Sequence, residues 1–139
     1  MTAEFQGAVD YQWRGRFGND ELNALHAEGF GHRLLDDDWF RQVKRHSLGW
    51  VTARDGEALV GFVNVAWDGG IHAFILDTLV AVAARRRGIG AALIGVAVRE
   101  ASAAGCDWLH VDFDEPLRDF YFKACGFRST PAGLIALRS

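Results

Sequence analysis

The chain has 139 residues, a formal net charge of -3 and a hydrophobic fraction of 50%. This length fits one domain, residues 1–139, and the composition excludes a disordered or fibrous protein. A mildly acidic chain also lacks the broad basic surface of a general nucleic-acid binder, so no nucleic-acid partner is expected.

The cysteines and apolar stretches indicate the cellular compartment of the protein. Cys106 and Cys125 have neither the spacing of a zinc site nor the number typical of a disulfide framework. The first residues do not resemble a signal peptide, and the longest nearly apolar stretch, 72–84, contains Asp77 and is too short to span a bilayer. We expect a cytoplasmic protein with reduced thiols, no metal and no membrane partner.

The first part of the chain predicts a strand, two helices and an antiparallel meander. In chain order these are a strand over 9–17, a helix capped by Asn19 and Asp20, a short helix from Asp36 and three strands over 48–82. The strands are separated by the hairpin signals Asp55-Gly56 and Asp68-Gly69-Gly70. The pattern favours consecutive antiparallel pairing.

The second part predicts a helix, a strand, a helix and a last strand. These are a nearly all-apolar helix over 89–104 ended by Gly105, a strand over 107–113, a helix over 115–126 with Pro116 in its first turn, and a strand over 133–138. The order is β-α-α-β-β-β-α-β-α-β. It predicts an α+β fold, an α/β sandwich in which a mixed, mostly antiparallel sheet has helices on both faces.

The stretch "ARRRGIGAAL", Ala84 to Leu93, has the composition of an anion site. Gly88 and Gly90 bring bare backbone amides to the start of a helix, where N–H groups and the helix dipole favour negative charge. It is not the phosphate loop of nucleotide hydrolases, because Ala91 and Ala92 replace the required Lys and Ser or Thr. The dinucleotide fingerprint is weak as well, since Leu93 stands where its third Gly or Ala belongs.

These residues resemble the GNAT superfamily of acyl-CoA-dependent N-acyltransferases. The family signature, Gln or Arg, two variable residues, Gly, one variable residue and Gly or Ala, matches 85–90. The stretch "YFKACGF", Tyr121 to Phe127, resembles the family's closing aromatic-x-x-x-Gly-Phe element, and the order of strands is the family's order. The resemblance covers roughly the last two thirds of the chain. It implies the GNAT fold and acetyl-CoA as co-substrate.

The resemblance also implies how coenzyme A is held. Amides over 85–90 would bind its pyrophosphate, with the three arginines adding contacts, and the strand over 79–82 would pair with the pantetheine amides. An amide near Leu79 and Val80 would stabilise the oxyanion. The expected cofactor-binding residues are Leu79, Val80, Ala81, Val82, Arg85, Arg86, Arg87, Gly88, Ile89, Gly90 and Ala91.

The reaction needs a base for the amine and an acid for the departing thiolate. Asp77, the only carboxylate within an apolar strand next to the cofactor loop, is the expected base, with a structural carboxylate as the alternative. His72 and His110 are weaker candidates. The family's acid is a Tyr four residues before the closing Gly, a position held here by Phe122, so the choice lies between the neighbouring Tyr121 and water.

We expect the acetyl acceptor to be an amine of a small molecule or peptide, but the sequence does not identify it. The protein could also form a homodimer. The candidate acceptor residues are Phe30, His32, Asp36, Asp37, Asp38, Trp39, Trp50 and Trp67, although acids at a helix start usually cap it and Trp is usually core. The predicted function is direct transfer of an acetyl group from acetyl-CoA to a primary amine, without a cysteine nucleophile. The alternative is a non-catalytic acyl-CoA-binding or sensing module of the same fold.

Overall fold

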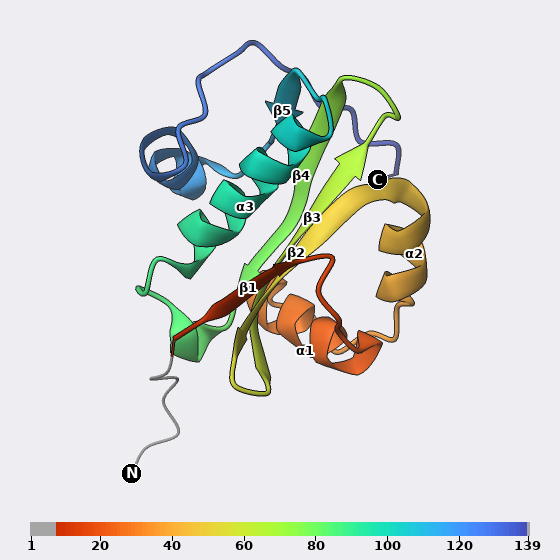
Figure 1. The fold of residues 1–139 in the computed structure, drawn as a ribbon, viewed down its shortest axis with the longest axis vertical. Helices are drawn as coiled ribbons and strands as arrows, with labels where there is room; N and C mark the ends of the chain where they lie inside the picture. The colour runs from red at the N-terminus through yellow and green to blue at the C-terminus, as the bar shows by residue number, and fades with distance from the viewer. Residues whose placement is uncertain (1–7, 139) are drawn as a thin grey trace.

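The computed structural model describes residues 8–138 and shows a five-stranded sheet with helices on both faces (Figure 1). The strands are β1 (Asp10–Trp13), β2 (Ser47–Asp55), β3 (Ala58–Trp67), β4 (His72–Val80) and β5 (Trp108–His110), and the α-helices are α1 (Asn19–Phe30), α2 (Trp39–His46) and α3 (Ile89–Ala103). They confirm the predicted α+β class. None of the described helices is long and apolar enough to cross a membrane.

The strands lie in the order of the chain, β1-β2-β3-β4-β5, with antiparallel pairing up to β4 and a parallel β4–β5 pair. Both predicted hairpin turns are present, and Gly56 (φ 62°) and Gly69 (φ 83°) have the left-handed backbone that makes glycine the suitable residue there. The parallel pair requires a crossover, which α3 supplies.

Two apolar clusters fix the helices against the sheet. On one face α3 packs on β2, β3 and β4 through Val51, Val63, Ile75, Ile89 and Leu93. On the other face α1 and α2 pack through Leu22, Leu25, Val43, Phe62 and Leu79. Every one of these side chains is at most 7% exposed. Burial on both faces explains why the central strands are apolar almost throughout rather than alternating.

The sheet opens between β4 and β5. Pairing joins only His72, Ala73 and Phe74 to the three residues of β5, whereas β4 continues to Val80. From Ile75 onward, β4 therefore has no strand beside it on this edge within residues 8–138. Unpaired backbone donors and acceptors on such an edge are free to bind an extended ligand.

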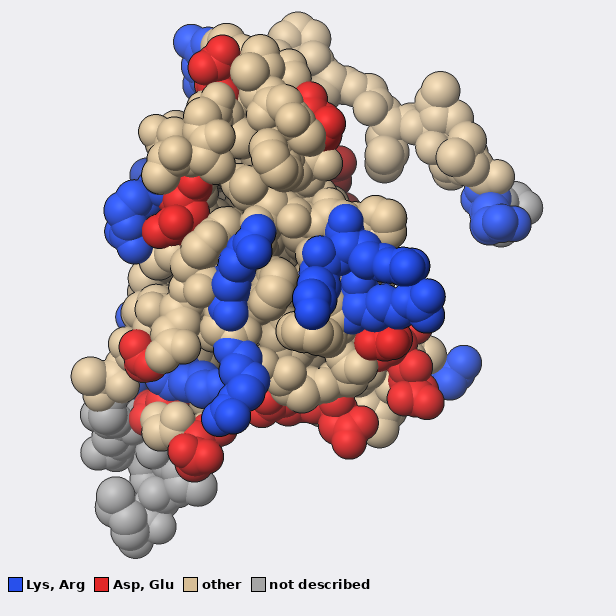
Figure 2. Space-filling model, turned by 45° about the vertical axis from the view of Figure 1, so that its right-hand side comes forward, with Lys and Arg blue, Asp and Glu red and all other residues tan. Residues whose placement is uncertain are grey.

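The C-terminal part differs from the prediction. The helix expected over 115–126 is a 3₁₀ turn, η2 (Glu115–Leu117), followed by a short π-helix, η3 (Phe120–Ala124). The strand expected over 133–138 is wrong, because these residues form no regular element and Leu134, Ile135 and Leu137 are 82–92% exposed. A strand needs a partner edge, and the segment ending at Arg138 extends away from the body instead (Figure 2).

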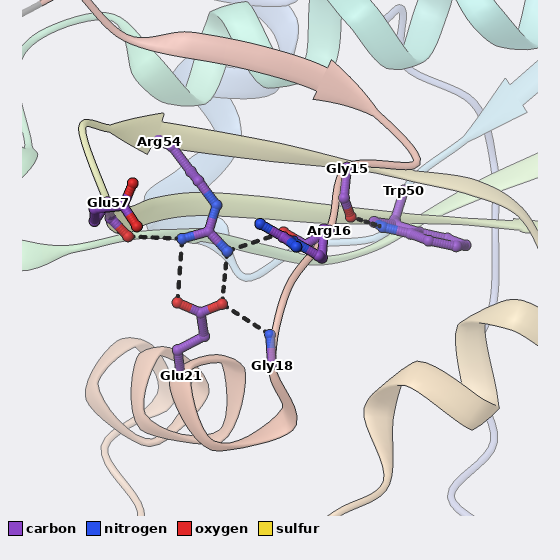
Figure 3. A network of polar contacts seen from close by, with 7 residues as sticks. All are labelled: Gly15, Arg16, Gly18, Glu21, Trp50, Arg54 and Glu57. Atoms are coloured by element: carbon purple, nitrogen blue, oxygen red, sulfur yellow. Dashed lines mark hydrogen bonds and ion pairs between the residues drawn. The ribbon is translucent and has the colours of Figure 1, made fainter.

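An ion pair ties α1 to the β2–β3 hairpin (Figure 3). The Glu21 carboxylate accepts hydrogen bonds from Arg54 Nη2 (2.6 Å), Arg54 Nη1 (3.2 Å) and the Gly18 N–H (2.8 Å). The guanidinium of Arg54 also donates to the carbonyls of Arg16 (2.9 Å) and Glu57 (2.8 Å). Partial burial alone would raise the pKa of Glu21, but these hydrogen bonds and the charges of Arg54 and Arg16 outweigh it and lower the pKa.

Replacing Glu21 with Gln is expected to reduce the free energy of unfolding by about 1 kcal/mol at pH 7, because the pair is partly solvent-screened. A lowered folded pKa means that this contribution is present above the unfolded pKa and is lost as the pH falls through the folded value. Urea denaturation of Glu21→Gln and wild type should therefore converge below pH 4.5, the ordinary value for Glu. Glu57→Gln, which leaves the Glu57 carbonyl in place, is the matched control.

Candidate active site

The connection from β4 to α3 ends in a helix start with unused donors. After the 3₁₀ turn η1 (Val82–Ala84), the chain takes positive φ angles at Arg86 (65°) and Gly88 (75°) before α3 begins. The first helical hydrogen bond runs from the Ala92 N–H to the Gly88 carbonyl (3.0 Å). The N–H groups of Ile89, Gly90 and Ala91 therefore have no acceptor inside the helix and are placed to bind an anion.

The two glycines of this loop have different roles. A Cβ at Gly88 would meet no heavy atom within 4 Å, so Gly88 is there for its left-handed backbone. A Cβ at Gly90 would lie 3.0 Å from Cζ of Phe120, so the missing side chain lets η3 pack against α3. A large residue at position 90 would displace the Phe120 ring, and its effect on ligand affinity would not isolate a phosphate contact.

The three arginines of the loop also differ in their surroundings. Arg87 Nη1 donates to Asp55 Oδ2 (3.1 Å), which ties the loop to the β2–β3 hairpin. Arg85 and Arg86 are exposed, so their guanidinium groups can turn towards a ligand. Ile89 is 2% exposed and Ala91 is half-buried, so these two residues can contact a ligand through their backbone N–H groups.

Among the four residues expected beside pantetheine, the backbone groups alternate in direction. The Ala81 N–H donates to the Val60 carbonyl of β3 (2.8 Å), and the Val82 N–H donates to Glu28 Oε1 of α1 (2.6 Å). Because N–H groups alternate along a strand, Leu79 also faces β3, and Val80 presents its N–H and carbonyl to the open edge. Val80 is therefore the donor of this set best placed for an extended ligand.

Asp77 lies at an irregularity of β4, with a positive φ of 54° and a register shift against β3. Its Oδ1 is 3.3 Å from Nε2 of His26 on α1. The other ring nitrogen of His26 is 2.7 Å from Nε2 of His32, whose Nδ1 is 2.6 Å from the Arg33 carbonyl. The side chains of His26 and Asp77 are 18% and 21% exposed, so the pair is partly desolvated but within reach of a substrate.

This chain of polar groups holds an additional proton when all of its links are hydrogen bonds. Three links join Asp77, His26, His32 and the Arg33 carbonyl, and each link needs one proton. Two neutral imidazoles supply one proton each, and neither a carboxylate nor a carbonyl supplies any. When both imidazoles are neutral and Asp77 is ionised, one of the three links therefore lacks a proton.

His26 is a site residue that the sequence reasoning missed. A signal was available, because His26 follows the buried Leu22 by four residues and so lies on the inward face of α1. A titratable residue on an apolar helix stripe faces either a partner or a site. The aromatic rings of Phe30, His32 and Trp39 lie 4.6–4.9 Å from the His26 ring between centroids.

Tyr121 is buried on the α3 side of β4, with 4% exposure. Its hydroxyl donates to Thr78 Oγ1 (3.1 Å), the residue next to Asp77, and its ring stacks on Phe113. Burial raises the pKa of Tyr121, the hydrogen bond with Thr78 opposes this in part, and the phenol keeps its proton beyond its ordinary value of 10.0. Phe122 contacts Phe113 edge-on and has the Arg118 guanidinium above its ring.

Most of the other candidates have structural partners. Asp38 accepts from the Arg41 N–H and caps α2, and the buried Trp39 and Trp50 donate to Asn23 Oδ1 and the Gly15 carbonyl. His72 and His110 hydrogen bond to each other at 2.8 Å at the start of β4, away from Asp77. The remaining acceptor candidates, Phe30, His32, Asp36, Asp37 and Trp67, are exposed or half-buried.

The two thiols are poor nucleophiles. Burial raises the pKa of Cys125 to about 11 and raises the pKa of Cys106 as well, so both are protonated at neutral pH. Within residues 8–138, no group of three or more His, Cys, Asp or Glu is placed to hold a metal ion.

Residues 12–127 match the family model described as Acetyltransferase (GNAT) family. No curated protein matches the chain. A GNAT family protein of Streptococcus pneumoniae is similar in structure, with a TM-score of 0.73, 20% identity and coverage of 94% of this chain and 100% of that chain. The aminoglycoside N-acetyltransferase AAC(6')-Iy in complex with CoA has a TM-score of 0.74, 17% identity and coverage of 96% and 97%. Glucosamine-6-phosphate N-acetyltransferase of Arabidopsis thaliana has a TM-score of 0.71, 11% identity and coverage of 95% and 100%.

Proposed function

The chain belongs to the GNAT family of acetyltransferases, and from this premise we propose that it transfers the acetyl group of acetyl-CoA to a primary amine. The observation that carries the proposal is the arrangement around the end of β4. Asp77 faces the α1 side, Tyr121 reaches the adjacent Thr78 from the α3 side, and the open strand edge leads into the bare N-terminus of α3.

Acetyl-CoA supplies the acetyl group as an activated thioester. The residues present fit it, because the open edge at Val80 offers strand-like hydrogen bonds and the N–H groups of Ile89, Gly90 and Ala91 offer an anion site. Arg85 and Arg86 add positive charge at the same place.

The amine proton leaves through Asp77. As the amine nitrogen forms a bond to the acetyl carbon and the carbon–sulfur bond breaks, Asp77 accepts the nitrogen's proton and His26 and His32 pass it towards solvent. The leaving sulfur takes a proton from the Tyr121 hydroxyl, whose raised pKa keeps that proton available at neutral pH. No covalent enzyme intermediate is involved.

The acceptor is an amine of a small molecule or peptide. The aromatic rings around His26 and the carboxylate of Asp77 suit a cationic amine through cation–π contact and charge. The second candidate, a module that binds acyl-CoA without turnover, is favoured by Phe122 at the family's usual Tyr position.

A steady-state assay that measures free thiol release from acetyl-CoA, with a panel of alkylamines, amino sugars and peptides, tests the function. Amine-dependent release with acetylated product supports the enzyme. CoA binding by calorimetry without turnover on any amine favours the binding module, and no CoA binding contradicts both.

Replacing Tyr121 with Phe is expected to lower kcat by about tenfold or more through loss of the general acid. The substitution removes the donor to Thr78 Oγ1, so the free energy of unfolding should fall by only about 1 kcal/mol, the net contribution of one hydrogen bond. The midpoint of the alkaline limb of the wild-type rate should lie above pH 10.0, because burial raises the pKa of Tyr121 above that ordinary value. Phe122→Tyr is the matched control and should have little effect. If Tyr121→Phe keeps both turnover and stability, water is the proton source.

A further inference from the structure

Lys and Arg side chains gather on the face formed by α2 and the β1–α1 connection (Figure 2). A hollow of about 340 Å³ on this face is lined by Arg14, Gly15, Arg16, Phe40, Lys44 and Trp50. Three of these residues are cations and none is an acid, although the whole chain has a net charge of -3. The volume is that of a small-molecule site.

The backbone beneath the hollow is fixed by hydrogen bonds (Figure 3). The Gly15 carbonyl accepts from Trp50 Nε1 (2.7 Å), and the Arg16 carbonyl accepts from Arg54 (2.9 Å). A Cβ at Gly15 would lie 1.9 Å from Thr52 Oγ1, so only glycine allows this close approach to β2. The connection is therefore held in one place, and the side chains of Arg14 and Arg16 extend from a rigid base.

The cations are set against aromatic rings. Arg14 has a left-handed backbone (φ 57°), donates its side chain to the Leu48 carbonyl and lies 6.0 Å from the Trp50 ring centroid. The Lys44 ammonium lies 5.6 Å from the Phe40 centroid. A left-handed conformation at a bulky residue is strained and is kept where the surroundings require it.

Two of the three cations have donors to spare. Within residues 8–138, neither the Arg16 guanidinium nor the Lys44 ammonium makes a hydrogen bond, although the charge of Arg16 acts on Glu21. Like charges that converge on one hollow repel each other, and an anion there would relieve the repulsion. Phe40 is 41% exposed and offers an apolar surface at the same rim.

We propose that this hollow binds a small organic phosphate. Arg16 and Lys44 hold the phosphate, Arg14 adds charge from its fixed position, and a flat apolar body lies against Phe40. Two to three positive charges match the charge of a phosphate monoester near neutral pH. The site is separate from the cofactor loop, because its lining residues come from the β1–α1 connection, α2 and β2, and none of them belongs to the loop between β4 and α3.

Titration of phenyl phosphate into the full chain, with and without saturating CoA, tests the proposal by calorimetry and by the NMR signal of the Trp50 indole N–H. Saturable binding that shifts this signal in both conditions is expected. Arg16→Ala/Lys44→Ala should weaken binding by about tenfold or more, since both charge-assisted contacts are removed. Arg41→Ala/Arg45→Ala is the matched control. Both residues lie on α2, as Lys44 does, but line a neighbouring hollow, so this variant should leave the affinity for phenyl phosphate unchanged.

Three results would overturn the assignment. The first is the absence of saturable binding by wild type, and the second is equal affinity for benzyl alcohol, which lacks the phosphate. The third is loss of binding in Arg85→Ala/Arg86→Ala, which would place the phosphate at the cofactor loop. If the double alanine variant does not fold, Arg16→Gln and Lys44→Gln tested singly give the same comparison.

Discussion

Asp77→Asn is expected to lower kcat by about 10² to 10⁴-fold, the range for loss of a general base. Asn is the suitable replacement because it has the shape of Asp and tolerates the left-handed φ of 54° at this position. Its amide oxygen can still accept from His26 Nε2, so the contact to α1 is retained while proton acceptance is lost. The effect should therefore fall on kcat, with CoA affinity nearly unchanged.

A variant of His26, the partner of Asp77, tests whether Asp77 has a catalytic or a structural role. His26→Gln keeps a polar partner for Asp77 but cannot pass a proton to His32, so it should lower kcat less than Asp77→Asn and change the pH profile of kcat. Thermal unfolding of both variants controls for packing. If Asp77→Asn retains the wild-type rate and pH profile, Asp77 is a structural carboxylate and the base must be sought elsewhere.

Gly88→Asp is expected to weaken CoA binding by about 100-fold at low salt relative to Gly88→Asn, because it adds a negative charge where the pyrophosphate is proposed to bind. Both side chains tolerate a left-handed backbone and differ mainly in charge, and a Cβ at this position meets no heavy atom within 4 Å. Calorimetric titration of CoA into the two variants, repeated at high salt, measures the difference.

The stabilities of these two variants should not follow their CoA affinities. A carboxylate at the start of α3 interacts favourably with the helix dipole, so Gly88→Asp should be at least as stable as Gly88→Asn. Lower affinity together with undiminished stability would locate the effect at the ligand. Equal CoA affinity of the two variants would contradict an anion site at the α3 N-terminus.

The sequence predicted those parts of the fold whose backbone conformation depends on residues close together in the chain. The turns at Gly56 and Gly69 depend on glycine's positive φ, and the start of α3 at Ile89 follows the left-handed backbone of Gly88. These features are readable because the residue type itself sets the backbone conformation. The order of β4, α3 and β5 followed from them.

The failures involve contacts between distant segments. The tail over 133–138 has the composition of a strand, but strand formation depends on a partner edge that the sequence does not reveal. The contact of His26 with Asp77 joins residues far apart in the chain, and its inward position on α1 was visible only as a polar residue on an apolar stripe. The different roles of Gly88 and Gly90 likewise depend on where the Phe120 ring lies.

The strand order has a consequence for the sequence of folding events. β2, β3 and β4 are joined by the short turns 56–57 and 68–71, so their pairing closes only small loops and is expected early. Pairing of β1 with β2 must enclose α1 and α2, and parallel pairing of β5 with β4 must enclose α3, so both close longer loops. The amides that we propose bind acetyl-CoA lie between the early meander and the late crossover. Slow assembly of the crossover would therefore delay activity after the bulk of the sheet has formed.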